Sequence, residues 1–208
     1  MVAFPAGHDG LGVAQRTLMP WLRSEQQQLP LSFSFSQDRG QRQSAWQEAA
    51  AQVWGYLRRG DDVVFASEGD VSFYSTFTYL AQTLLTWHPQ VSVEVVPGVC
   101  SPLATAAVLG IPLTIQSQRL AVLPALYRVA ELERVLDWAE AVVLMKVSSV
   151  YPQVWSVLQQ RGLLSCSYVV QHVTWPDQLI YTDLQHHPNL ELSYFSVMII
   201  QVAANSLG

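Results

Sequence analysis

The sequence has 208 residues, of which 50% are hydrophobic and only 13% charged, and its formal net charge is -5. A disordered chain combines low hydrophobicity with high charge, so this composition excludes that class and predicts one or two compact domains. Because charged residues are too sparse to cover a monomer, we expect a homo-oligomer.

The same counts argue against several partners. Lys146 is the only lysine and the arginines are scattered, so no basic stripe is available for nucleic acid. Cys100 and Cys166 lack the spacing of a metal site, which predicts buried free thiols in a cytoplasmic protein. The first ten residues do not have the pattern of a signal peptide. The uncharged stretch 95–115 is interrupted by five prolines and glycines, which favours buried core over a membrane span.

Short β-branched runs alternate with longer amphipathic segments along the chain, which is typical of an α/β fold. Ser44 is expected to cap the second helix in a capping box with Gln47, and Ser101 with Pro102 is expected to begin the fourth. In the first half the pattern predicts strands at 2–4, 31–36, 62–66 and 91–96 and helices at 12–27, 44–60, 71–86 and 101–110.

The irregular segment 111–118 joins this half to a second series of elements. We place the domain boundary there, with one α/β domain at 1–112 and another at 113–208. Three of the late strands follow one another without a helix, so the second domain is expected to end in a mixed sheet. The elements expected here are strands at 119–123, 141–146, 167–173, 178–182 and 194–202 and helices at 129–138 and 151–160.

Three common kinds of site find little support. No GxSxG string occurs, which argues against a hydrolase nucleophile. His186 and His187 would point to opposite faces of a strand, and neither they nor His172 stand in a metal-ligand spacing, so no metal is predicted. The Gly10-Leu-Gly12 string is only weakly similar to a dinucleotide fingerprint, because Gln15 stands where a third glycine should be.

Two loops are more informative, because each follows an apolar strand and precedes a helix, where α/β proteins bind ligands. In the first, at 67–76, Gly69 permits close backbone approach, and Glu68 and Asp70 offer acceptors to a ligand or simply cap the helix. The second, at 93–101, is either part of a site or a plain turn. Lys146 closes a later strand and either binds a ligand or extends into solvent.

Four strings occur in an order that resembles the tetrapyrrole (corrin/porphyrin) methylase family: SEGDVSFY at 67–74, VEVVPGVCS at 93–101, VVLMK at 142–146 and YFSVMII at 194–200. The similarity runs from about Val2 to Val202. The EGD, LMK and YFS strings are most similar to the members that methylate carbon 20 of precorrin-2 or cobalt-factor II.

This resemblance implies two α/β domains, a homodimer and a role in cobalamin biosynthesis. It also implies S-adenosylmethionine (SAM) in a cleft between the domains and a tetrapyrrole in a trough beside it. Methyl transfer is an in-line displacement that needs aligned reactants rather than a dedicated nucleophile, which agrees with the missing triad.

By matching position, the resemblance also implies the residues that contact SAM, with Lys146 able to meet a substrate propionate as well. Each side chain keeps a structural alternative, such as a helix cap or a core position, and no catalytic base is identified. The implied SAM residues are Glu68, Gly69, Asp70, Ser75, Thr76, Phe77, Pro97, Gly98, Val99, Ser101, Thr105, Met145, Lys146, Thr174 and Met198.

Two departures from the family pattern keep alternatives open. Val71 stands where the family's Gly-Asp-Pro loop has proline. Members also normally begin with a strand and a GxGPGD loop before the segment that Val2–Pro5 matches, and this sequence has neither. The start therefore lies upstream of Met1, or the strand has been lost. The second case would suit an inactive paralogue that binds SAM or a tetrapyrrole, or that serves only as a dimer partner. Methylation of another macrocycle carbon, as in uroporphyrinogen III, is a further alternative.

Overall fold

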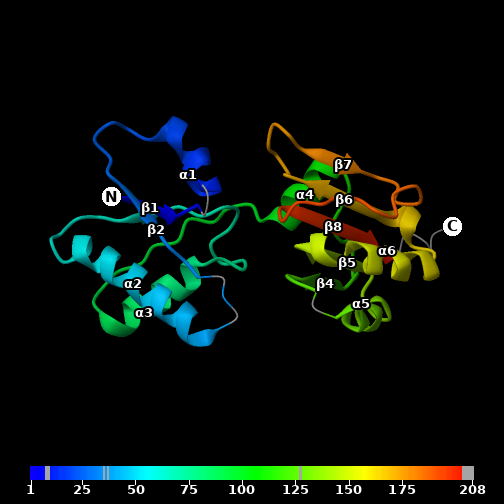
Figure 1. Cartoon of the computed structure of the whole chain (residues 1–208), viewed down its shortest axis with the longest axis horizontal. Helices are drawn as coiled ribbons and strands as arrows, with labels where there is room; N and C mark the ends of the chain where they lie inside the picture. Colours follow the sequence, from blue (N-terminus) through cyan, green and yellow to red (C-terminus); the bar gives the residue numbers. More distant parts are fainter. Residues whose placement is uncertain (8–9, 35, 37, 127, 203–208) are drawn as a thin grey trace. The chain divides into compact units, whose positions relative to one another are not determined.

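The computed structural model describes residues 1–7, 10–34, 36, 38–126 and 128–202. The chain divides into two compact units, Met1–Cys100 and Ser101–Gly208, each with helices and a sheet (Figure 1). This division falls earlier than the boundary at 112 that the sequence suggested, because helix α4 (Ser101–Leu109) packs on strand β8 (Ser196–Gln201) of the second unit. In the described part of the chain, no helix has the length and apolar character that crossing a membrane requires.

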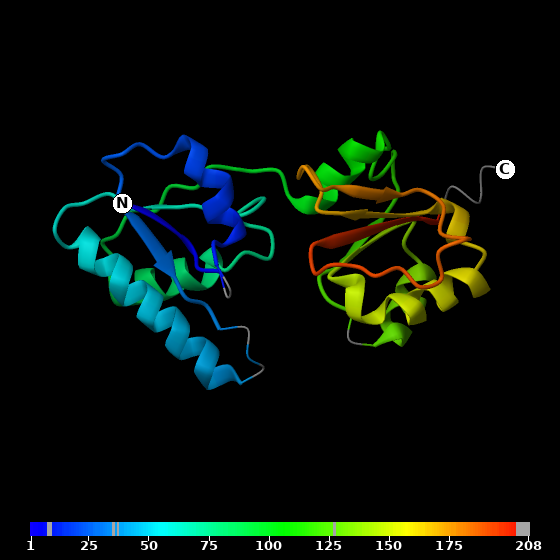
Figure 2. The ribbon, with the colours of Figure 1, turned by 45° about the horizontal axis from the view of Figure 1, so that its top comes forward.

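The first unit is built on a parallel sheet of three strands in the order β2-β1-β3. The strands are β1 (Val2–Pro5), β2 (Gln28–Leu31) and β3 (Val64–Phe65). Side chains of β1 alternate between the two faces of this sheet. Val2 and Phe4 face α1 (Val13–Leu18), whereas Ala3 packs with α2 (Arg39–Leu57) and α3 (Phe77–Trp87). Figure 2 shows α1 and the α2–α3 pair on opposite sides.

Several boundaries in the first unit differ from the sequence expectations. Helix α1 is short and continues only as the 3₁₀ turn η1 (Met19–Trp21). Helix α2 begins before Ser44, because the Asp38 side chain already caps it by accepting a hydrogen bond from the Gln41 N–H (2.9 Å). Strand β2 covers Gln28–Leu31 rather than 31–36. The prediction of a strand at 91–96 was wrong: the segment is not part of either sheet.

The second unit contains a five-stranded mixed sheet in the order β4-β5-β8-β6-β7. Only β4 and β5 are directly paired in parallel, and β8 runs antiparallel between β5 and β6. Helices α5 and α6 cover one face of the sheet and α4 packs on the other. The remaining elements are β4 (Leu120–Leu123), α5 (Val129–Leu136), β5 (Ala141–Met145), η2 (Val147–Val150), α6 (Tyr151–Gln160), η3 (Leu164–Cys166), β6 (Ser167–Gln171) and β7 (Leu179–Tyr181).

Candidate functional site

Asp70 joins the two loops of the first unit that the sequence singled out. Its Oδ2 accepts a hydrogen bond from the Gly98 N–H (2.7 Å), and its Oδ1 accepts one from the Ser72 N–H (2.8 Å) and one from the Ser72 hydroxyl. The bond from the Ser72 hydroxyl, followed by those from the Gly98 and Ser72 amides, holds the pKa of Asp70 below its usual value. The carboxylate therefore stays charged and fixes the two loops against each other.

Glycine is required where these loops meet. A Cβ atom added to Gly98 would lie 2.2 Å from the carbonyl oxygen of Gly69, far closer than atoms can approach. Gly69 itself has φ of 70°, a left-handed conformation that glycine adopts without strain. The two glycine backbones thus form a close-packed contact in which no side chain intervenes.

Glu68 connects the same loop to the start of α1. Its carboxylate accepts a hydrogen bond from the Ala14 N–H (3.1 Å). Although much of the residue is exposed, withdrawal of the carboxylate from water raises its pKa, and the bond from Ala14 opposes this only in part. Farther along the loop, the hydroxyls of Ser67 and Ser75 lie 3.0 Å apart, and the Ser75 hydroxyl accepts a hydrogen bond from the Phe77 N–H.

The remaining predicted SAM residues of segments 76–105 differ in their exposure and in the unit to which they belong. Pro97 and Val99 are exposed beside Gly98, and Thr76 precedes α3 without a capping side-chain bond. Ser101 begins α4, in the second unit. Thr105 in the same helix is fully buried, and its hydroxyl has no hydrogen-bond partner among the described residues.

The predicted residues that follow β5 and β6 lie at one end of the second unit's sheet. Lys146 has a left-handed backbone, its N–H donates to the Ser196 carbonyl (3.3 Å), and its Nζ lies 5.1 Å from the centre of the Tyr194 ring. Met145 pairs with Val197 and is half-buried. Thr174 is exposed, and its N–H donates to the Gln178 side chain.

Met198 lies on the core side of β8, where it is fully buried under α5 and α6. Its side chain is therefore enclosed by protein. The neighbouring residue on the strand, Val197, faces α4 instead. Any contact of Met198 with a ligand would have to come from its backbone.

Sequence reasoning did not predict that four rings meet at the same end of the sheet; we call them the aromatic cluster: His172, Trp175, Tyr194 and Phe195. Ring centres are 5.0 Å apart for His172 and Trp175, 5.2 Å for Trp175 and Phe195 and 5.3 Å for Tyr194 and Phe195. The Nδ1 of His172 lies 2.8 Å from an oxygen of Asp177. Tyr194 and Phe195 belong to the YFSVMII string that the sequence singled out, and the structure leaves their large side chains 51% and 40% exposed.

Register explains why Lys146 and the aromatic cluster meet. Strand β8 pairs with β5 on one side and with β6 on the other, so Met145 and Val170 both lie opposite Val197. The residues that follow β5 and β6 therefore flank the beginning of β8. The result is a surface that combines one cation, flat rings and a histidine–aspartate pair.

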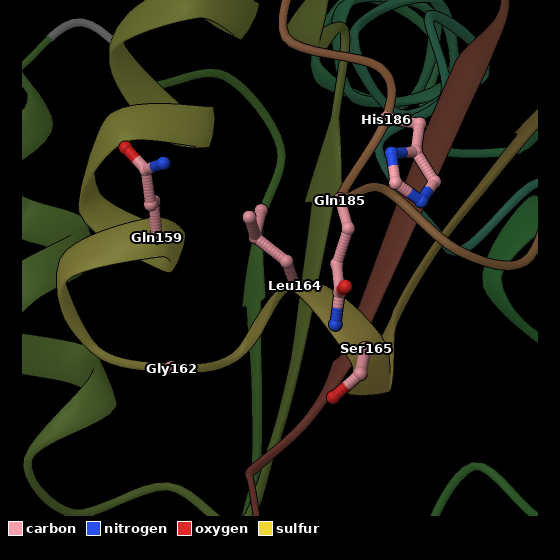
Figure 3. A pocket seen from close by; sticks show the side chains of 6 residues that line it. All are labelled: Gln159, Gly162, Leu164, Ser165, Gln185 and His186. Carbon is pink, nitrogen blue, oxygen red and sulfur yellow. The ribbon is translucent and has the colours of Figure 1, made fainter.

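A surface pocket of about 360 Å³ lies elsewhere in the second unit, at the end of α6 (Figure 3). Polar side chains, including Gln159, Gln185 and His186, dominate its lining. None of the predicted site residues borders it. The described residues contain no group of three or more His, Cys, Asp or Glu that could hold a metal ion there or elsewhere.

Comparisons with known proteins agree with these observations. The model of the tetrapyrrole (corrin/porphyrin) methylases matches residues 6–186, and the chain belongs to that family. The cobalt-precorrin-2 C(20)-methyltransferase of Salmonella typhimurium is 30% identical, over 94% of this chain and 82% of the relative. The precorrin-2 C(20)-methyltransferase of a Sinorhizobium species is also 30% identical, over 94% of this chain and 80% of the relative.

Solved structures show the same fold. A cobalt precorrin-4 methyltransferase covers 97% of this chain with a TM-score of 0.69 at 22% identity, and the match spans 83% of that protein. The uroporphyrin-III C-methyltransferase of Thermus thermophilus, complexed with S-adenosylhomocysteine, covers 98% of this chain at 17% identity; the match spans 86% of that protein, with a TM-score of 0.62. The predicted tetrapyrrole methylase fold of mixed α/β character is confirmed.

Proposed function

We propose that this protein transfers a methyl group from SAM to carbon 20 of precorrin-2 or of its cobalt-containing form, in cobalamin biosynthesis. The observation that carries the proposal is the 30% identity, over 94% of the chain, to two relatives with that activity. The structure supports it by keeping the Glu68–Asp70 loop and the Gly98 turn joined. The inactive paralogue is not favoured, because the relatives are named as methyltransferases.

The residues present fit a nucleotide-like methyl donor. Gly69 and Gly98 are both exposed, and their backbones meet with no side chain between them, so a donor can lie against the main chain there. Asp70 is occupied in holding the loops, so its role is to position Gly69 and Gly98 rather than to contact the donor through both oxygens. The bound donor would supply an electrophilic methyl group on a sulfonium.

In the second unit, Lys146 and the aromatic cluster fit a flat ring system that carries carboxylates. Exposed Tyr194 and Phe195 offer ring faces on which a conjugated macrocycle can stack. The Lys146 ammonium, held beside Tyr194, is suited to pair with a propionate at the edge of the macrocycle. These residues bind and orient the acceptor, and alignment of the two reactants then accounts for most of the acceleration.

We further propose that the working protein is a cytoplasmic homodimer. Two observations support the dimer. Only 13% of the residues are charged, and large apolar side chains are left in solvent, among them Trp21 at 80% exposure. Analytical ultracentrifugation of the purified chain is expected to give a single dimeric species. A monomer at all concentrations would contradict the proposal.

The enzymatic test is incubation of the purified protein with SAM and either precorrin-2 or cobalt-factor II, followed by mass spectrometry. We expect a gain of one methyl group on one of the two acceptors and none on uroporphyrinogen III. Calorimetry with S-adenosylhomocysteine runs in parallel as a measure of donor binding. Donor binding without any methyl gain would refute the enzyme and leave a binding protein. Methylation of uroporphyrinogen III instead would refute the assigned carbon.

A further inference from the structure

The proposed methylation of carbon 20 leaves one proton to be removed. This bridging carbon carries one hydrogen in the acceptor. Its electron pair forms a bond to the methyl carbon of SAM, and the bond between that methyl and sulfur breaks with its electrons left on sulfur. Carbon 20 then holds a hydrogen and a methyl group, and the macrocycle has gained a positive charge. A base must therefore take the hydrogen as a proton, so that the C–H electron pair returns to the conjugated ring.

His172, directly after β6, is an imidazole whose two nitrogens have different surroundings. Its Nδ1 lies 2.8 Å from a carboxylate oxygen of Asp177. Because an ionised carboxylate only accepts hydrogen bonds, Nδ1 of the neutral ring carries the hydrogen and Nε2 keeps its lone pair. In the part of the chain that the structure describes, no hydrogen bond engages Nε2. Nε2 is thus the nitrogen that can accept a proton.

Two neighbouring residues hold this imidazole in place. The Trp175 ring is stacked on it, with ring centres 5.0 Å apart and planes inclined by 22°. The Trp175 N–H donates to the His172 carbonyl, and the His172 N–H donates to the Phe195 carbonyl, both at 2.9 Å. The His172 side chain remains 23% exposed. The ring is therefore oriented before a substrate binds and is still accessible to one.

The other groups at this end of the sheet are poorly suited to take the proton. The Lys146 ammonium has no lone pair, and the phenol of Tyr194 is a much weaker base than imidazole. The carboxylate of Asp177 is engaged with His172. Imidazole, by contrast, takes up and releases a proton near neutral pH.

The proposed position of the acceptor brings its edge to this imidazole. A tetrapyrrole is several times wider than a phenyl ring, and the ring centres of Phe195 and His172 are 6.5 Å apart. A macrocycle stacked on Phe195 would therefore extend as far as His172. Its bridging carbons lie between neighbouring pyrrole rings, away from its centre, in the part that reaches beyond Phe195.

We infer, on the basis of the proposed function, that His172 is the catalytic base that takes the proton from carbon 20 after methyl transfer. Nε2 forms the new bond to hydrogen as the C–H electron pair returns to the macrocycle. Asp177 is a positioning residue, because it fixes the tautomer and stabilises the imidazolium that forms. The imidazolium then releases its proton to solvent.

Two substitutions remove the base and suit the backbone. His172 has φ of 50°, a conformation that asparagine and glycine adopt more easily than other residues. In His172→Asn the side-chain amide can still donate to Asp177, but the proton-accepting nitrogen is lost. In His172→Gly the space of the side chain is open to free imidazole. His186→Gly, at an exposed position elsewhere in the second unit, is the matched control.

The experiment measures methylation of precorrin-2 and cobalt-factor II beside binding of S-adenosylhomocysteine and of a carboxylated porphyrin. Turnover should fall at least about a hundredfold in both His172 variants, with both affinities unchanged. Added imidazole should raise the turnover of His172→Gly at least about tenfold and should not affect His172→Asn or His186→Gly. Deuterium at carbon 20 should slow His172→Asn but not the unchanged chain, because proton loss limits turnover only in the variant.

Asp177→Asn tests the positioning role. The new amide would donate to Nδ1, which moves the ring hydrogen to Nε2 and leaves His172 without a free lone pair. Turnover should fall at least about tenfold with porphyrin binding unchanged, and imidazole should not restore it, because His172 still fills the site.

Three results would overturn the inference while the unchanged chain methylates its acceptor. They are full activity of His172→Asn, a loss of activity that follows weaker porphyrin binding, and a His172→Gly variant that imidazole does not restore. Failure of the unchanged chain to methylate either acceptor is a different result. It would refute the proposed function and the role of His172 with it.

Discussion

Replacing Gly98 with alanine tests whether the contact between the two loops organises the first unit. The new Cβ would lie 2.2 Å from the Gly69 oxygen and 3.0 Å from the Gly69 carbonyl carbon, both backbone atoms that cannot rotate away. Since real contacts do not fall below 3.0 Å, the loops must separate by at least about 0.8 Å. That shift would lengthen the 2.7 Å bond between Gly98 and Asp70 beyond normal hydrogen-bond range.

The expected cost follows from that displacement. Forcing one extra carbon into a packed contact costs about 1–3 kcal/mol. For a unit of this size the unfolding midpoint should fall by about 5–20 °C. Affinity for S-adenosylhomocysteine should fall at least about tenfold, because displaced loops no longer present the same backbone.

Gly55→Ala is the control. Gly55 lies inside α2, and a Cβ added there would meet nothing within 4 Å. Alanine should stabilise that helix by about 0.5–1 kcal/mol and leave ligand affinity unchanged. Thermal unfolding followed by circular dichroism and calorimetry would measure both quantities. If Gly98→Ala unfolds at the wild-type temperature and binds the ligand equally well, the contact does not have the role assigned to it.

Four further outcomes are expected. The lowered pKa of Asp70 means that its loop contacts are present above the ordinary aspartate pKa and are lost as pH falls through the lowered value; ligand affinity should show this loss, and Asp70→Asn should abolish it. Glu140, whose pKa is lowered to about 2 by hydrogen bonds from Arg119, should likewise stabilise the fold until pH falls toward about 2; acid titration of the thermal midpoint should show less dependence in Glu140→Gln. Tyr151→Phe removes the hydroxyl bond to the His187 carbonyl and should cost about 1 kcal/mol in urea unfolding, and an unchanged midpoint would speak against that bond. Trp175→Ala should weaken binding of a carboxylated porphyrin measured by fluorescence quenching, whereas Trp21→Ala, at an exposed position of the first unit, should not.

Helix ends could be predicted where the terminating residues act locally. Helix α6 occupies Tyr151–Gln160 as expected, because proline near its start and glycine after its end act within one turn. Helix α2 shows the limit of such reasoning. Both Asp38 and Ser44 have capping side chains, and the sequence does not reveal which one meets a free amide.

Only part of the candidate site's geometry could be predicted from the sequence, for a related reason. The Glu68–Asp70 loop and the Gly98 turn could be found from sequence, because strand-end acids and glycines are recognisable. That Asp70 bonds to Gly98 depends on how two segments 28 residues apart approach each other, which no local pattern contains. The aromatic cluster was missed because its members come from two different loops and meet only through the pairing of β6 with β8.

Backbone conformation is a second observation in favour of a binding site at the end of the second unit's sheet, where β5 and β6 end. Lys146, His172 and Thr174 all have positive φ, between 50° and 67°, although none is glycine. Such conformations cost free energy for residues with a side chain, and glycine would avoid that cost. Three non-glycine residues therefore hold this conformation where β5 and β6 end. This indicates that the contacts of their side chains compensate for the backbone cost. The Lys146 ammonium contacts the ring of Tyr194, on which we propose that the tetrapyrrole stacks, and His172 contacts Trp175, which packs against the second such ring, Phe195.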